Sequence, residues 1–108
     1  MLKEKRRAAR IKRRMSARLE TQGKTVPGIA MQFSQNGLFL QTRHLIPKNT
    51  PIIVYIPTKA AKEIRVEGKV IFRRNDQPLG LGNRPGGIGV EILQPTQEYI
   101  HFLAEFQT

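Results

Sequence analysis

The chain has 108 residues, a length typical of one domain, and 19 Lys and Arg against 8 Asp and Glu give it a formal net charge of +11. This excess indicates an anionic partner: a nucleic acid, a nucleotide, an acidic protein or an anionic membrane surface. The absence of cysteine excludes disulfides and thiolate metal sites. No apolar run approaches the roughly 20 residues of a membrane span, and the charged N-terminus lacks the apolar core of a secretion signal. We therefore expect a cytoplasmic protein with no membrane span.

Residues 1–16 are predicted to form a flexible basic arm. Arginines recur at every fourth position, at Arg6, Arg10, Arg14 and Arg18. They would share one face of a helix, but the apolar stripe beside them is thin and the like charges repel, so we expect a frayed arm. Two of these guanidiniums could bind a phosphate or the O6/N7 edge of guanine, because their planar fork fits either in a bidentate manner. The alternative is a solubilising tail or a general anion-binding segment.

Residues 17–94 are predicted to form short β-strands. The clearest period-two pattern runs over 64–73, where Gly68 indicates a bend of the kind that closes a barrel and Phe72 falls on the apolar face. The stretch 75–86, rich in Gly and Pro, is predicted to be a loop. The expected strands are 17–21, 25–34, 38–42, 51–57, 64–73 and 88–92.

The second predicted strand brings polar side chains to a turn. Phe33 continues an apolar alternation, so Gln32 and Ser34 point together to the opposite face. Asn36-Gly37 is a strong reversal signal because both residue types tolerate positive φ. Two hydrogen-bonding side chains are therefore expected at the rim of a sheet, although an ordinary hairpin with a hydrated face would show the same pattern.

Residues 95–108 are predicted to contain a helix. Thr96 is a suitable N-cap, and Tyr99, Ile100, Leu103 and Phe106 are spaced to form one apolar face. About six strands and one terminal helix predict an all-β fold with a C-terminal helix, which covers an open end or a seam of a small antiparallel barrel.

Several catalytic and cofactor motifs are absent. The glycine-rich stretch 80–87 is not a dinucleotide fingerprint, because its third glycine would fall on Pro85 and no helix follows. His44 and His101 lie far apart in the sequence, and isolated histidines are poor evidence for a metal site. No carboxylate accompanies a candidate nucleophile in a recognisable pattern. We expect neither a metal nor an enzyme.

Three motifs in order resemble the PilZ domain family, the bacterial receptors for cyclic di-GMP. Arg10 to Arg14 matches the family's RxxxR, Gln32 to Gly37 matches [D/N]xSxxG, and Gly87 to Ile92 matches its glycine-rich final strand. Each motif is weak alone, but their order and spacing are fairly specific. The resemblance extends from Arg10 to the C-terminal helix and implies a six-stranded antiparallel β-barrel.

The chain departs from the family pattern at Gln32, which replaces Asp or Asn. Its longer side chain reaches a different point and loses more rotamer entropy when it is fixed. The arginine motif also has two registers, because Arg14 to Arg18 fits RxxxR as well. We prefer Arg10 and Arg14, which leave more residues for the first strand.

The resemblance implies cyclic di-GMP as the ligand and no other cofactor. Arg10 and Arg14, or Arg18 in the other register, would bind phosphates and guanine edges. Gln32 and Ser34 would hydrogen-bond a guanine, and Gly37 would permit the tight turn and a close backbone approach. Ligand would order the arm against the barrel and so create a surface for an effector protein.

Two other functions stay open. A divergent PilZ adaptor that binds no nucleotide would act through protein contacts in motility, pilus or exopolysaccharide systems, and Gln32 favours it. A small basic barrel could instead bind RNA or DNA through the charge of the arm. Nucleic acid is the less favoured partner, because aromatic residues are few and most occupy predicted core positions.

Overall fold

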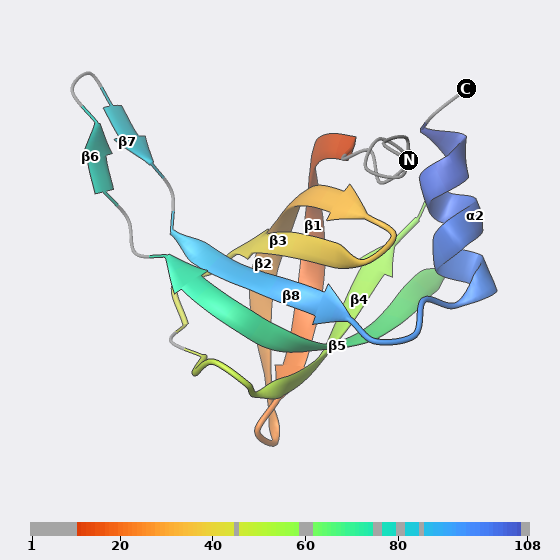
Figure 1. Ribbon diagram of the computed structural model, residues 1–108, viewed down its shortest axis with the longest axis horizontal. Helices are drawn as coiled ribbons and strands as arrows, with labels where there is room; N and C mark the ends of the chain where they lie inside the picture. The colour runs from red at the N-terminus through yellow and green to blue at the C-terminus, as the bar shows by residue number, and fades with distance from the viewer. Residues whose placement is uncertain are drawn as a thin grey trace, which may run out of the picture.

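The computed structural model describes residues 11–44, 46–58, 62–74, 77–79, 82–84 and 86–106. Six strands pair antiparallel in a closed barrel with the order β1-β2-β3-β8-β5-β4, and helix α2 lies beside the β2–β3 turn (Figure 1). This architecture confirms the predicted fold class. The barrel strands and the helix are β1 Ile11–Thr21, β2 Lys24–Ser34, β3 Gly37–Gln41, β4 Pro51–Pro57, β5 Glu63–Arg74, β8 Gly87–Ile92 and α2 Gln97–Glu105.

Every barrel strand contributes a fully buried apolar side chain to the core. Burial of each such side chain stabilises the fold by about 1.5–3 kcal/mol relative to exposure. Because successive side chains of a strand point to opposite faces, only alternate residues can face the core. This explains the period-two patterns of the sequence. The six side chains, in chain order, are Leu19, Phe33, Leu40, Val54, Val70 and Val90.

The first strand begins earlier than expected. We predicted a frayed arm through residue 16, but β1 starts at Ile11, which pairs with Phe33, so that prediction is wrong for 11–16. Between Lys12 and Met15 the register shifts by one residue, which is a β-bulge. Ile11 and Met15 pack against the core while the basic side chains between them face solvent. Strand pairing therefore extends through a segment whose charge had indicated fraying.

The β1–β2 and β2–β3 connections are both tight turns, but their backbone conformations differ. Gln22 and Gly23 both adopt positive φ, at 51° and 74°, in the tight connection between β1 and β2. In the β2–β3 connection the turn residues are Gln35 and Asn36, and neither Asn36 nor Gly37 has positive φ. The explanation we gave for that turn is wrong: Gly37 is already the first residue of β3.

The stretch 75–86 is more structured than the predicted loop. It contains two short strands, β6 (Gln77–Leu79) and β7 (Gly82–Arg84), which form a separate two-stranded sheet (Figure 1). Three residues per strand are too few to establish an alternating pattern, so hydrophobic periodicity could not predict them.

Helix α2 is capped as predicted, but its buried face differs. The Thr96 hydroxyl accepts a hydrogen bond from the Tyr99 backbone nitrogen at 3.1 Å. Phe102 is buried, with its ring centroid 5.7 Å from that of Phe33, whereas Ile100 is 37% exposed. The face of the helix that packs against the core therefore consists of residues 99, 102, 103 and 106, which have the i, i+3, i+4, i+7 spacing of one helical face.

Gly68 allows β5 and β8 to approach closely inside the barrel. A Cβ atom there would lie 2.4 Å from the carbonyl oxygen of Glu91 and 2.6 Å from Cγ1 of Val90. The first of these is a backbone atom, so the clash could be relieved only by separating the strands. The predicted bend at Gly68 is thus a position where the sheet tolerates no side chain.

We expect Gly68→Ala to destabilise the fold by about 2–4 kcal/mol, because the added methyl overpacks a buried backbone contact. Urea unfolding followed by circular dichroism measures the change. Glu67→Ala is the matched control: Glu67 is exposed on the same strand and forms an exposed ion pair with Arg65, so its loss should cost under about 1 kcal/mol. Equal unfolding midpoints for the two variants would contradict the steric clash that we infer at position 68.

A second prediction concerns Tyr99, whose hydroxyl donates a 2.6 Å hydrogen bond to the carbonyl oxygen of Ser34. Burial raises the pKa of Tyr99 above its ordinary value of 10.0, so above pH 10 the unfolded chain loses this proton while the folded chain keeps it. The free energy of unfolding should therefore fall by about 1.4 kcal/mol per pH unit from this group.

Tyr99→Phe removes the hydrogen bond and should lower the unfolding free energy by about 1 kcal/mol at pH 8. It also removes the titration, so the deficit relative to wild type should shrink as the pH rises from 10 to 11. Denaturant titrations of both proteins from pH 8 to pH 11 measure the loss of the hydrogen bond and the change of the deficit with pH. Parallel pH profiles for the two proteins would refute the linkage.

Candidate functional site

The end of β2 that carries Ser34 is fixed by contacts on its inner side. Phe33 fills the core against Phe102, and the hydroxyl of Tyr99 binds the Ser34 carbonyl. Gln32 and Ser34 flank the inward-facing Phe33, so they belong to the outer face of β2. The Ser34 hydroxyl lies 3.4 Å from the Gly37 carbonyl oxygen across the turn. Core packing thus holds the two predicted polar residues at the rim of the barrel.

A shallow pocket of about 400 Å³ lies at this rim. It joins the predicted residues of the β2–β3 hairpin to side chains of β5 that the sequence had not indicated. Phe39, directly opposite Gln32 in the β2–β3 ladder, connects the two groups. The lining residues that matter here are Gln32, Ser34 and Gly37 from the hairpin, together with Phe39, Phe72 and Arg74.

Gly37 contributes to the pocket through backbone proximity. A Cβ atom at this position would lie 3.1 Å from the Val90 carbonyl oxygen on the neighbouring strand β8. Gly37 is thus required for close approach of β3 to β8, whereas the expected positive φ is absent. A side chain here would push β3 away from β8 and disturb the floor of the pocket.

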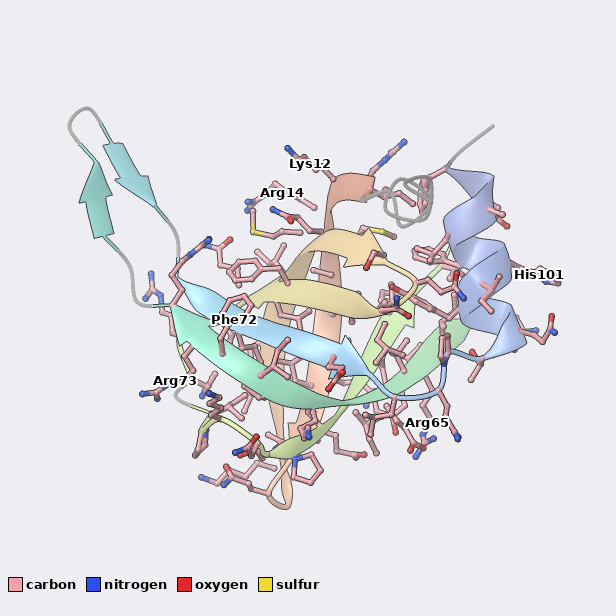
Figure 2. All side chains as sticks on the ribbon, viewed as in Figure 1. Lys12, Arg14, Arg65, Phe72, Arg73 and His101 are labelled. Atoms are coloured by element: carbon pink, nitrogen blue, oxygen red, sulfur yellow. The ribbon has the colours of Figure 1, made fainter. Side chains whose placement is uncertain are left out.

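The start of β1 brings cations beside this pocket. Lys12 pairs directly with Gln32, and the bulge that follows places Arg14 near Met31, with Nη1 4.0 Å from the thioether sulfur. Figure 2 shows Lys12 and Arg14 projecting from the first strand, away from the barrel interior. Arg14 was predicted to precede the first strand, and it lies within it. Arg10 falls outside the described residues.

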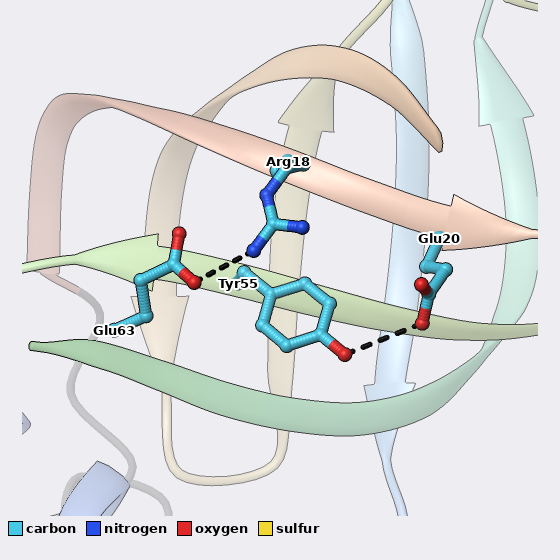
Figure 3. Close-up of polar contacts among 4 residues, drawn as sticks. All are labelled: Arg18, Glu20, Tyr55 and Glu63. Carbon is cyan, nitrogen blue, oxygen red and sulfur yellow. Dashed lines mark hydrogen bonds and ion pairs between the residues drawn. The ribbon is translucent and has the colours of Figure 1, made fainter. Parts of the chain in front are cut away.

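The Arg18 side chain forms its contacts away from this pocket. Its Nη2 lies 2.6 Å from a carboxylate oxygen of Glu63, and its guanidinium sits 4.2 Å from the centroid of the Tyr55 ring (Figure 3). Tyr55 in turn donates to Glu20 at 3.2 Å. Arg18 pairs with Pro27 in the β1–β2 ladder, far along β2 from Ser34. The structure does not bring Arg18 to the pocket with Gln32 and Ser34.

Sequence reasoning missed the aromatic and cationic part of the pocket. We expected Phe72 in the core, and that expectation is wrong: its side chain is 46% exposed. A register shift between Val70 and Phe72 turns the strand and moves Phe72 to the outer face. Arg74 places its guanidinium 4.4 Å from the centroid of the Phe39 ring. No single-sequence signal could have located these contacts, because they depend on the partner strand β8.

Within the described part of the chain, no three His, Asp or Glu side chains come together in a way that could hold a metal ion. The same residues include no helix with the length and apolar character needed to cross a bilayer. A larger hollow of about 570 Å³, near the β1–β2 turn, contains none of the predicted site residues.

Comparison with known proteins places this barrel among relatives. The model of the PilZ domain matches residues 4–106, and no curated protein matches the chain. Among solved structures, the Bacillus subtilis inhibitor of motility MotI/DgrA has a TM-score of 0.74 at 10% identity over 92% of this chain. The chain spans about half of that protein, 47% of its length.

Two isolated PilZ domains are also similar. That of CeSA from a cellulose-synthesizing bacterium has a TM-score of 0.66 at 13% identity, covering 94% of this chain and all of that one. The PilZ domain of YcgR from Escherichia coli, solved with c-di-GMP, has a TM-score of 0.68 at 11% identity, covering 93% and 86%. Identities this low establish the fold alone. The family model, however, matches nearly the whole chain, so the chain belongs to the PilZ domain family.

Proposed function

We propose that this PilZ domain is a receptor for cyclic di-GMP, which it binds at the outer rim of the barrel. One observation carries the proposal: Gln32, Ser34 and Gly37 line a single pocket, and the Arg14 bulge of β1 lies beside it. The ligand has two phosphates and two guanines, and the site offers cations next to hydrogen-bonding groups. The similar Escherichia coli domain was solved with the same nucleotide.

Each residue has a role that follows from its chemistry. Arg14, with Arg10 just before β1, supplies charge-assisted hydrogen bonds to phosphate and to the guanine edge. The Gln32 amide and the Ser34 hydroxyl bind a guanine from the rim, and Gly37 keeps the backbone close beneath it. The contacts of Arg18 with Glu63 and Tyr55 support the register that uses Arg10 and Arg14.

Binding would also change what the domain offers to other proteins. A ligand that is held jointly by Arg10 and Ser34 draws the chain before β1 against the rim, and this fixed arrangement forms a new surface. We propose that an effector protein, of a motility or exopolysaccharide system, recognises that surface. The switch therefore needs no movement of the barrel itself.

Arg14→Ala should weaken binding of cyclic di-GMP by about 10–100-fold, because charge-assisted hydrogen bonds are worth about 1.5–3 kcal/mol. Isothermal titration calorimetry measures the affinity. Arg18→Ala is the matched control: it removes the same charge from the same strand, and its affinity should stay within about twofold of wild type. Equal affinities for the wild type and both variants would overturn the assignment of Arg14.

The same titrations separate a receptor from a nucleic-acid-binding barrel. A site that reads guanine prefers cyclic di-GMP to cyclic di-AMP, whereas binding through phosphate contacts tolerates any base and weakens steeply with salt. Preference for a single-stranded oligonucleotide over cyclic di-GMP, with a steep salt dependence, would favour the nucleic-acid function.

Gln32 supports a second candidate, an adaptor that binds no nucleotide. Its side chain is one methylene longer than that of the family's Asn, so more rotamer freedom is lost when the amide is fixed. We expect Gln32→Asn to tighten binding of cyclic di-GMP by about threefold in the same calorimetric assay. If neither the wild type nor this variant binds cyclic di-GMP or a single-stranded oligonucleotide, the adaptor function is favoured.

A further inference from the structure

One row of residues crosses the outer face of the barrel through the pocket. Gln32 on β2 pairs with Phe39 on β3, Phe39 pairs with Gly89 on β8, and Gly89 pairs with Phe72 on β5. Residues opposite one another in adjacent strands point to the same side of a sheet. The row therefore places an amide at one end and two aromatic rings along one surface.

Phe72 lies directly on the backbone of β8. A Cβ atom on Gly89 would be 2.2 Å from Cε2 of the Phe72 ring, so the ring occupies the space that a side chain would need. The bulge after Val70 is what turns Phe72 outward, and its ring is 46% exposed. A single exposed phenylalanine is ordinary. This one, however, is placed by a bulge and a glycine over the floor of a pocket.

A guanidinium completes the same surface. Arg74 lies 4.4 Å from the centroid of the Phe39 ring, which it covers, and Phe39 is inclined only 21° to Phe72 at a centroid separation of 6.2 Å. Flat aromatic and guanidinium groups side by side are the groups on which purine bases stack. Arg74 on β5 and the cationic start of β1 flank β2, β3 and β8 in the strand order of the barrel, so a dianionic ligand that crosses these strands would meet positive charge at both ends.

The pocket thus has two chemically different walls. The hairpin wall, Gln32 and Ser34, offers hydrogen-bonding groups suited to the edge of a base. The opposite wall, Phe72 and Arg74, offers flat surfaces suited to the face of a base. A purine needs both kinds of contact to be held in one orientation.

We propose that Phe72 and Arg74 form a stacking wall for a purine base of the cyclic dinucleotide, while Gln32 and Ser34 bind its edge. This inference rests on the proposed function. It adds a binding surface on β5 that comes from neither the arginine motif nor the hairpin motif. Stacking on such a wall is insensitive to which purine is bound, so selectivity for guanine comes from the hairpin wall.

The test is calorimetry of cyclic di-GMP with variants of each wall residue. Phe72→Ala should weaken binding about tenfold, and Phe72→Tyr, which keeps the aromatic face, should stay within about twofold of wild type. Arg74→Ala should weaken binding more than Arg73→Ala, which removes the same charge from an exposed neighbour outside the pocket. Leu93→Ala, at a 59% exposed apolar residue near the other hollow, should leave the affinity unchanged.

A spectroscopic readout is independent of affinity. The chain has no tryptophan, so Phe72→Trp creates a single indole whose emission a stacked guanine should quench. If wild type binds but Phe72→Ala binds equally well and the Phe72→Trp emission does not respond, the stacking wall is refuted and the receptor function stands. If wild type does not bind cyclic di-GMP at all, the proposed function fails and the inference fails with it.

Discussion

Close approach between β8 and its two neighbours is the constraint on which the rest of the molecule depends. β8 is inserted between β3 and β5, although it comes last among the strands of the chain. Gly68 lets the β5 backbone reach Glu91 inside the barrel, and Gly89 leaves room for Phe72 outside it. A glycine on β5 thus permits closure of the barrel against the inner face of β8, and a glycine on β8 forms the floor of the pocket on the outer face.

The core and the rim are connected through a short series of contacts. Phe102 of α2 packs on Phe33, and the Tyr99 hydroxyl binds the Ser34 carbonyl. A helix that covers the barrel interior therefore also fixes the strand end that presents hydrogen-bonding groups to the pocket. Because these supports are buried, the backbone that carries the hairpin wall is fixed by the fold itself, which would lower the entropic cost of binding the proposed ligand.

Local patterns predicted those features that depend on local physics. The alternation that ends in buried Val70, the Thr96 cap and the inward direction of Phe33 follow from residues a few positions away, and all were predicted. The exposure of Phe72 and the pairing of Arg18 with Glu63 were not. Both depend on strands distant in the sequence, and a bulge in a ladder reverses the facing of every residue beyond it.

The basic strand and the C-terminal helix touch at their outer ends. The Arg13 guanidinium lies 4.6 Å from the centroid of the Phe106 ring, which itself packs edge-on against Phe102 at 5.1 Å. Entry to and exit from the domain are therefore neighbours in space, an arrangement that suits insertion of one module into a loop of another. In such a fusion both connecting linkers would join the domain next to the bulged, cationic start of β1. Tension on either linker would therefore act directly on the first residues of β1.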